Sequence, residues 1–290
     1  NANRATLTTG QVQINNGQIS GYDVNQGEIV VTGAGMDSRQ QDSTDLIARA
    51  VKINAGVWAS QLKVTAGRNV VDAAHDVVAA KTADGSVSPG IAIDVAALGG
   101  MYANKIHLMG TETGVGVHNA GHIGASAGDV VVNADGSISN SGYITATNNV
   151  QLTTGDHLDN QGHLYALANT TVSSRGTLTN RGVIAAQNNT TVSAAGIHSN
   201  KTSVFAAGMG SDGALAAAGD LSLTSQGKLT VNGKNSAAGR LTAQGAVLDF
   251  SDSQTYGNNL SLQATTGDIS TSGATLSASQ QFTARTSGTL

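Results

Sequence analysis

The chain contains no cysteine and a single proline, Pro89, among its 290 residues. Without thiols it has no disulfide scaffold, no cysteine metal site and no nucleophilic cysteine. Aromatic residues make up only 3% of the sequence. A protein with so few rings must have a narrow core, which Val, Ile, Leu and Ala side chains fill.

Charge is also scarce, at 12% of residues against roughly 25% in an average domain. The 15 Lys and Arg residues are scattered singly and the net charge is −4, so the sequence predicts no binding of nucleic acid. No apolar run approaches the roughly 20 residues of a membrane span, which predicts no membrane insertion. The chain starts at Asn1 with neither Met nor a signal peptide, so we expect a mature fragment.

What the chain does have is a period. An Asn-x-Gly triplet recurs at intervals of 21, 20 and 20 residues. Its four copies are Asn119-Ala-Gly121, Asn140-Ser-Gly142, Asn160-Gln-Gly162 and Asn180-Arg-Gly182. Apolar and polar residues alternate around each triplet, which is typical of short strands with one buried face. Self-similarity of this kind predicts a solenoid.

Residue choice favours strands over helices in this solenoid. Glycine accounts for 37 residues, about 13% of the chain against a usual ~7%, and Thr, Ser, Asn and Val are abundant. Helices of such composition would be weak. Three short strands and their turns need roughly 20 residues, and crossovers between parallel strands are right-handed. The predicted fold is therefore an all-β, right-handed parallel β-helix with extrahelical loops or hairpins near the N-terminus.

The period also places side chains in rows. Asn119, Asn140, Asn160 and Asn180 are expected to stack as an internal amide ladder, each bonding the backbone of the next coil at a turn. Ile144, Leu164 and Ile184 hold one place in successive frames and are expected to form a buried core row. A ligand-binding role for the Asn row is the alternative.

Two segments break the rhythm between residues 37 and 118. Residues 37–44 form a polar excursion, and residues 73–90 are expected to protrude as a hairpin or loop. Residues 1–36 still follow the strand and turn pattern. Trp58, the sole tryptophan, is expected to pack beside the polar excursion, and a carbohydrate platform is its alternative role.

No catalytic, cofactor or metal site is predicted. Gly208 to Gly213 matches G-x-G-x-x-G but lacks the long helix and the acidic residue of a dinucleotide site. The carboxylates comprise 17 Asp and 2 Glu spread singly, and turn Asp is mostly a capping residue. A β-helical polysaccharide-degrading enzyme, which needs clustered carboxylates or a Ca²⁺ site, is therefore a remote alternative.

Several blocks resemble one family. They are Asp45 to Ala59, Gly67 to Asp72, Leu98-Gly-Gly-Met-Tyr-Ala103, and Gly110 to Gly121. These blocks are similar to the haemagglutination-activity domain of two-partner-secreted exoproteins, the family of filamentous haemagglutinins and of the stick proteins of contact-dependent growth inhibition. The resemblance identifies residues 1–125 as the C-terminal portion of that secretion domain and residues 126–290 as haemagglutinin-type repeats.

The resemblance implies a virulence-type adhesin that crosses the periplasm and outer membrane and is secreted or displayed on the bacterial cell surface. Its partner would be an outer-membrane transporter with periplasmic and barrel domains, and its coils would project a distal adhesin or toxin. The candidate transporter-recognition loop contains Asp37, Gln40, Asp42 and Thr44. Direct binding of a cell-surface receptor or glycan is the main alternative function, and the five Asn-x-Ser/Thr sequons are candidate acceptors of sugar.

Overall fold

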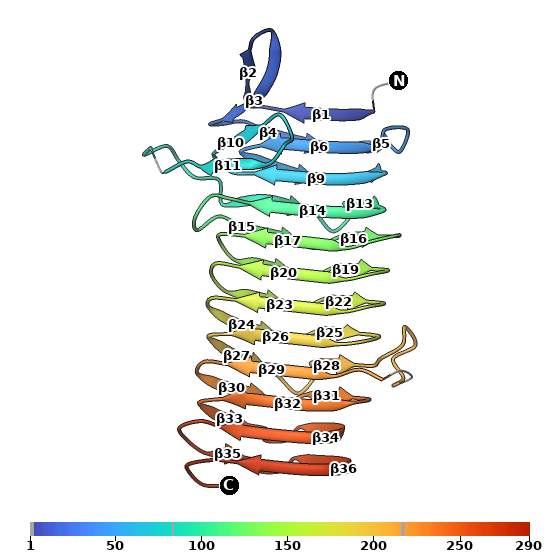
Figure 1. Ribbon diagram of the computed structural model, residues 1–290, viewed down its shortest axis with the longest axis vertical. Helices are drawn as coiled ribbons and strands as arrows, with labels where there is room; N and C mark the ends of the chain where they lie inside the picture. Colours follow the sequence, from blue (N-terminus) through green and yellow to red (C-terminus); the bar gives the residue numbers. More distant parts are fainter. Residues whose placement is uncertain (1–2, 83, 216–217) are drawn as a thin grey trace. The chain divides into compact units, whose positions relative to one another are not determined.

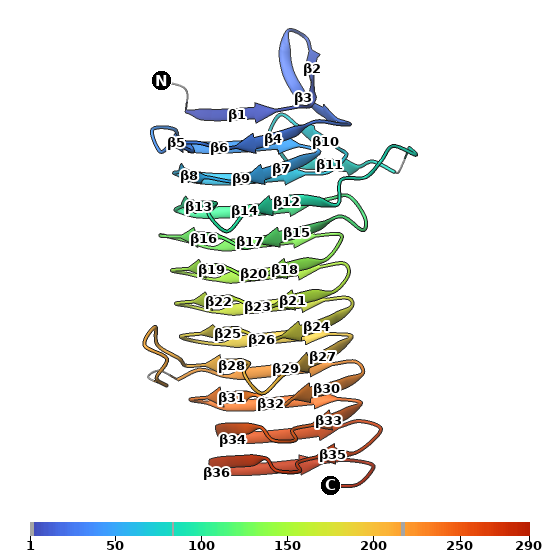
Figure 2. The same ribbon diagram turned by 180° about the vertical axis from the view of Figure 1, so that it is seen from behind.

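The computed structural model describes residues 3–82, 84–215 and 218–290, and these contain strands but no helix. The chain forms two compact units, Asn1–Tyr143 and Ile144–Leu290. In each unit short parallel strands stack coil upon coil (Figure 1), and Figure 2 shows the same coils from behind. The expected all-β parallel β-helix is confirmed.

The N-terminal unit has three parallel faces. The first contains β1 (Arg4–Thr8), β6 (Ser43–Ala48), β9 (Gln61–Ala66), β14 (Lys105–Gly110) and β17 (Val130–Ala134). The second contains β5 (Met36–Ser38), β8 (Gly56–Ala59), β13 (Gly100–Ala103) and β16 (His122–Ala125). The third contains β4 (Glu28–Val31), β7 (Ala50–Ile53), β12 (Ile91–Val95), β15 (Gly116–Asn119) and β18 (Ile138–Asn140).

The core of this unit consists of inward-facing rows that run from coil to coil. Register places one aliphatic residue of each first-face strand beside the next, and the row Leu46, Val64, Leu108 and Val132 is fully buried. Val57, Met101 and Ile123 form the matching row on the second face. Parallel stacking at about 4.8 Å lets side chains of similar size fill the narrow interior.

Four strands of the N-terminal unit lie outside this parallel arrangement. They form an antiparallel sheet in the order β11 (Val77–Ala80), β10 (Asn69–Asp72), β3 (Gln18–Val24) and β2 (Gln11–Asn15). Residues 11–24 are therefore a projecting hairpin, and the expectation that all of residues 1–36 follow the coil pattern is wrong. Asn16 and Gly17, with φ of 49° and 77°, make the two-residue turn, a conformation that Asn-Gly adopts readily.

The C-terminal unit repeats the three faces with more regular coils. Its first face contains β20 (Val150–Thr154), β23 (Thr170–Ser174), β26 (Thr190–Ala194), β29 (Leu221–Ser225) and β32 (Arg240–Gly245). The second contains β22 (His163–Ala166), β25 (Val183–Ala186), β28 (Val204–Ala207) and β31 (Lys234–Ala237). The third contains β21 (Leu158–Asn160), β24 (Thr177–Asn180), β27 (Gly196–Ser199), β30 (Lys228–Val231), β33 (Val247–Asp249) and β35 (Ile269–Ser270).

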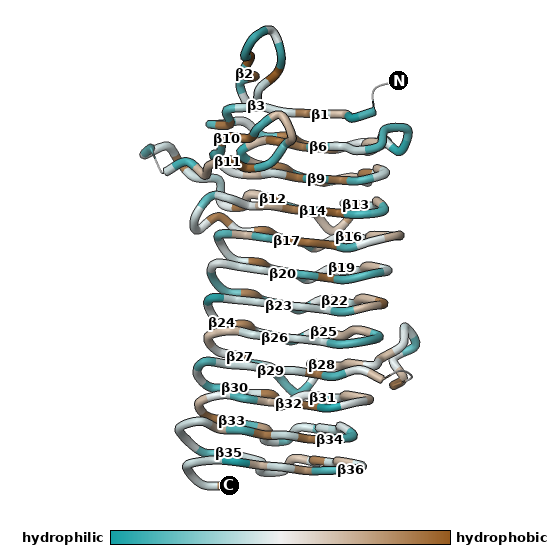
Figure 3. Tube along the Cα trace, in the orientation of Figure 1, coloured by the Kyte–Doolittle hydropathy of each residue, from teal (hydrophilic) through white to brown (hydrophobic). Residues whose placement is uncertain are grey.

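Two long strands, β34 (Gln254–Ala264) and β36 (Thr275–Arg285), each run through both the first and the second face. β19 (Tyr143–Ala146) falls at the boundary between the units. Hydrophobic and hydrophilic residues alternate along the strands (Figure 3), as the sequence pattern requires. The glycine-rich stretch from Gly208 to Gly213 lies in the loop between β28 and β29, which gives it no place in a strand-to-helix turn.

The structure explains why each triplet ends in glycine. A Cβ on Gly142 would lie 2.0 Å from the carbonyl oxygen of Gly121, and one on Gly182 would lie 2.1 Å from that of Gly162. Each of these two turns stacks its backbone directly on the turn of the previous coil, so a side chain at this position would push the coils apart. The glycine therefore serves close approach of two backbones.

Candidate functional site

The residues that could carry function gather where excursions leave the coils of the N-terminal unit. The antiparallel sheet covers a small apolar cluster of Tyr22, Val24, Ile47 and Val71, with Val77 packed against it. His75 lies in the turn between β10 and β11, at φ 68°, and its ring makes a T-shaped contact with Tyr22, with the ring centroids 5.3 Å apart. Its Nδ1 lies 3.1 Å from a carboxylate oxygen of Asp45, and both side chains are about 4% exposed. The sheet is thus fixed to the coils by packing and by buried polar contacts, since Asn69 Nδ2 of β10 also donates to Thr111 Oγ1 at 3.0 Å.

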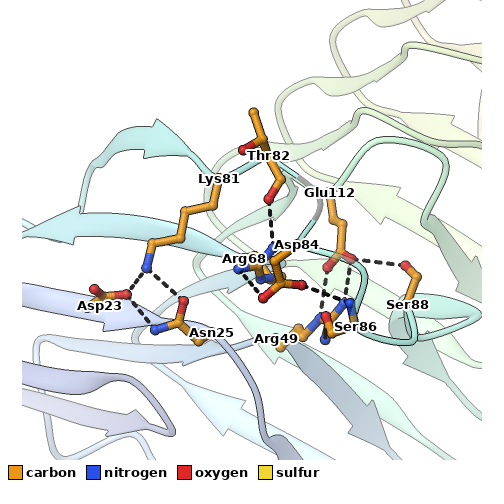
Figure 4. A network of polar contacts seen from close by, with 10 residues as sticks. All are labelled: Asp23, Asn25, Arg49, Arg68, Lys81, Thr82, Asp84, Ser86, Ser88 and Glu112. Carbon is orange, nitrogen blue, oxygen red and sulfur yellow. Dashed lines mark hydrogen bonds and ion pairs between the residues drawn. The ribbon is translucent and has the colours of Figure 1, made fainter.

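The loop that follows β11 is fastened to the body by the polar contacts drawn in Figure 4. At its start, Lys81 binds the carboxylate of Asp23 and donates to Asn25 Oδ1 at 2.8 Å. Arg68 follows, donating to the carbonyl oxygen of Thr82 at 2.7 Å and pairing with Asp84 at 2.7 Å. These contacts tie the loop to β3 and to the turn before β10.

The strongest anchor is the pair of Arg49 and Glu112. The guanidinium donates to both carboxylate oxygens, at 3.1 and 2.8 Å, and the two side chains are only 10% and 14% exposed. Arg49 also donates to Ser86 Oγ at 3.0 Å, and Ser88 Oγ donates to Glu112 at 2.9 Å, so the pair holds both sides of the loop. The hydrogen bond from Arg49 lowers the pKa of Glu112 below its usual value and raises the pKa of Arg49.

The polar excursion is shorter than the sequence suggests. Asp37 lies in β5 and Thr44 in β6, and only residues 39–42 form the turn between them. Asp37, Gln40 and Asp42 are exposed, and the hydrogen bond from Arg39 lowers the pKa of Asp37 to about 2. Thr44 is fully buried, and its hydroxyl lies 2.6 Å from that of Ser38. The expectation that Thr44 belongs to an exposed recognition loop is therefore wrong, because its side chain closes the base of the turn.

The four triplet asparagines are buried and linked within each unit. Asn119 Nδ2 donates to Asn140 Oδ1 at 2.8 Å in the N-terminal unit, and Asn160 Nδ2 donates to Asn180 Oδ1 at the same distance in the C-terminal unit. The Oδ1 atoms of Asn119 and Asn180 also accept from the backbone N–H two residues later, at 3.2 Å. Each of these amides caps its own turn or reaches the neighbouring coil, which satisfies polar groups that are at most 1% exposed.

Replacing Asn160 with Leu should lower the free energy of unfolding by about 1–3 kcal/mol, because Asn180 Oδ1 and the carbonyl oxygen of Val183 would each lose a donor in a dry interior. Denaturant unfolding followed by circular dichroism measures the change. Asn188→Leu, at an exposed turn, is the control. Equal stability of the two variants would contradict a stabilising role for the Asn160 amide.

The core row lies where the register predicts. Ile144, Leu164 and Ile184 are at most 1% exposed, and Leu164 pairs with Ile184 across β22 and β25. The row continues to Phe205 and then to Asn235, which is also fully buried. There the Asn235 amide donates to Val231 O at 3.2 Å and to Thr255 Oγ1 at 3.1 Å, so a polar pair replaces the aliphatic stack.

A second amide ladder was not predicted from the sequence. Asn149, Asn169 and Asn189 recur every 20 residues just before a first-face strand, and each Oδ1 accepts the backbone N–H of the residue one coil later, at 2.9–3.2 Å. Asp220 continues the pattern by accepting from Arg240 at 2.7 Å. Its period was visible in the sequence, but without a constant flanking glycine it was less conspicuous than Asn-x-Gly.

In the described parts of the chain, no group of three or more His, Cys, Asp or Glu is arranged to hold a metal ion. Nor is any helix there long and apolar enough for a membrane span. The site is thus a set of anchored loops on a repetitive scaffold, an arrangement suited to recognition by a partner.

Comparison with known proteins shows which family this scaffold resembles. The TPS secretion domain model matches residues 1–140, so this part of the chain is similar to the TPS secretion domain family. The expected resemblance is thereby confirmed. The chain is 53% identical over 286 residues to "Toxin CdiA" of Yersinia pestis, which covers 99% of this chain and 9% of that protein.

A second relative, "tRNA nuclease CdiA-2" of Burkholderia pseudomallei (strain 1026b), is 50% identical over 292 residues, covering 100% of this chain and 9% of its own length. The solved structure of a filamentous hemagglutinin secretion domain is 28% identical, covers 59% of this chain and 57% of that chain, and has a TM-score of 0.48. The chain thus spans about a tenth of the length of the curated relatives that it matches. The TPS secretion domain is a family of secreted exoproteins.

Proposed function

We propose that residues 1–125 engage an outer-membrane transporter during two-partner secretion and that the coils then project a distal adhesin or toxin. The observation that supports export most directly is the family match over residues 1–140, because it contains every excursion of the N-terminal unit. The hairpin β2–β3, the turn at residues 39–42 and the described residues of the loop after β11 leave the coils without disturbing their stacking. Such segments offer a partner residues that differ from the repeated coil pattern, and we propose that the transporter reads them in the extended chain, before the coils close.

We further propose that residues 126–290 are haemagglutinin-type repeats whose role is mechanical. Each coil of the C-terminal unit pairs mainly with its neighbours, as in the series β22, β25, β28 and β31. Folding can therefore proceed coil by coil as an extended chain emerges from the transporter. The absence of cysteine means that no disulfide forms in the periplasm to block this passage.

Within the N-terminal unit, we propose that the turn at residues 39–42 is read by the transporter. We expect Gln40→Ala with Asp42→Lys, made in the full-length exoprotein, to reduce secretion severalfold while the purified chain keeps its strand content. The side chains of both residues are exposed, so their replacement should leave the coils intact. Exoprotein in the medium and on the cell surface is measured by immunoblot with the cognate transporter present.

Asn188→Ala, at an exposed turn of the C-terminal unit, is the matched control and should be secreted like the parent. Normal secretion of the Gln40/Asp42 double variant would remove this turn from the mechanism. A misfolded double variant would be seen by circular dichroism and replaced by Gln40→Ala alone.

A second candidate function is direct binding of a cell-surface glycan by the N-terminal unit. It is favoured by the arrangement of aromatic side chains on the second face, where rings of successive coils contact one another.

A further inference from the structure

An aromatic row runs along the outer surface of the second face of the N-terminal unit. Its members are Trp58 of β8, Tyr102 of β13, His122 of β16 and Tyr143 of β19, with successive ring centroids 6.1, 5.4 and 6.1 Å apart. The whole chain has only nine Phe, Trp and Tyr residues, and three of them lie in this row. Tyr102 is 37% exposed and Tyr143 is 53% exposed, so the row faces solvent.

Glycine gives the first two rings their orientation. In β8 and β13 a glycine lies two residues before the aromatic residue, on the same face of the strand, as Gly56 and Gly100. A Cβ on Gly56 would lie 2.3 Å from the Trp58 ring, and one on Gly100 would lie 2.7 Å from the Tyr102 ring. Each ring therefore folds back along its own strand and covers the glycine.

The two rings together form a flat shelf. Gly56 pairs with Gly100 and Trp58 with Tyr102 in the parallel register, so the rings cover equivalent places on neighbouring strands. Their planes differ by only 18°. Because both rings lie over the sheet, this small angle puts them side by side, with an aromatic face of each turned outward.

Polar groups border the shelf. Asp37 is the register partner of Trp58 on β5, and Arg39 donates to its carboxylate at 2.9 and 2.6 Å. His122 makes a T-shaped ring contact with Tyr102, and burial lowers the pKa of its imidazole. An apolar surface with charged and hydrogen-bonding groups at its edge suits a ligand that has flat C–H faces and hydroxyl groups at its rim.

We propose that the aromatic row is a binding site for a pyranose oligosaccharide, with sugar faces packed on Trp58 and Tyr102 and sugar hydroxyls bonded to the Asp37 and Arg39 pair. A chain of sugars provides a repeated flat ring, and the row provides about one aromatic ring per coil of ~4.8 Å. This proposal specifies the second candidate function and is independent of recognition by the transporter.

The order of assembly favours a glycan over the transporter as occupant. Trp58, Tyr102 and Tyr143 are far apart in the sequence and meet only when the coils of the unit have closed. A transporter that receives an unfolded chain would not meet the assembled shelf. A ligand outside the cell meets the folded protein.

The sole tryptophan of the chain makes the test direct, since Trp58 alone gives indole fluorescence. The purified 290-residue chain is titrated with hexasaccharides of β-linked glucose and of β-linked N-acetylglucosamine. We expect a saturable change in Trp58 emission with at least one of them. Tyr102→Ala should weaken binding about tenfold or more, and Trp58→Ala should abolish the heat of binding in calorimetry.

Tyr256→Ala is the matched control, because it removes a partly exposed ring from β34 in the C-terminal unit and should leave the affinity unchanged. Melting curves show whether each variant is folded, and His122→Ala replaces any variant that is not. The proposal is overturned if neither sugar changes the emission, if folded Tyr102→Ala binds like the parent, or if only the periplasmic domain of the transporter shifts the Trp58 signal. Normal export of Tyr102→Ala would leave the role in secretion intact and separate the two functions.

Discussion

Replacing Leu164 with Asp should lower the free energy of unfolding by about 4 kcal/mol. Leu164 is fully buried, and its register partner Ile184 is fully buried as well. A carboxylate there would face only aliphatic side chains and would either ionise without a partner or take up a proton. In both cases the apolar contact with the next coil is lost.

Urea unfolding followed by circular dichroism measures this change, and hydrogen exchange at β22 and β25 localises it. The local measurement matters because coils of a repeat protein can open separately. Thr171→Asp, at an exposed position of β23, is the control and should change stability little. A Leu164→Asp melting temperature within about 2 °C of the parent would mean that the side chain faces solvent and that the register is shifted by one residue.

The period of the sequence predicted the parts of the fold that depend on repetition. Asn-x-Gly specifies a turn at which two backbones meet, and alternation around it specifies which side chains point inward. Together they gave the parallel β-helix and the frame in which Leu164 and Ile184 become neighbours. The turn triplet and the alternation are local patterns that recur in several coils. Each recurrence supports the same prediction independently.

The antiparallel hairpin could not be separated from the coils in this way. Val12 and Ile14 alternate with polar residues as a coil strand does, yet they are 45% and 70% exposed on β2. Alternation of apolar and polar residues indicates a strand with one apolar face. It does not show whether the neighbouring strand is parallel or antiparallel. The Asn16-Gly17 dipeptide was the available signal, because it favours a two-residue turn that parallel coils do not use.

Contacts between residues far apart in the sequence could not be predicted from the repeat pattern. Arg49 and Glu112 are 63 positions apart, and nothing near either residue indicates the other. The flat orientation of Trp58 depends on Gly56 and on a neighbouring strand that begins at Gly100. From the sequence we singled out only Trp58 of the aromatic row, and without its side-chain conformation we favoured packing over a platform for it.

Replacing Arg49 with Met should lower the free energy of unfolding by about 3 kcal/mol at neutral pH, because the carboxylate of Glu112 would stay nearly buried without its partner. The loop that follows β11 should also lose its anchor at Ser86, since Arg49 donates to Ser86 as well. Urea unfolding measures the first effect, and limited proteolysis within the loop measures the second. Arg39→Met breaks the exposed pair with Asp37 and should change neither.

The pH dependence distinguishes loss of charge pairing from loss of packing. In the parent, Arg49 lowers the pKa of Glu112 below 4.5, so the pair stabilises the fold above that pH and the contribution is lost as pH falls through the lowered pKa. In Arg49→Met, burial without a partner raises the pKa of Glu112, and the carboxyl becomes neutral on mild acidification. The stability difference between parent and variant should therefore shrink as pH falls from 7 toward about 4. A difference that stays constant over this range would assign the loss to packing of the Arg49 stem, and the buried charge pair would not be what holds the loop.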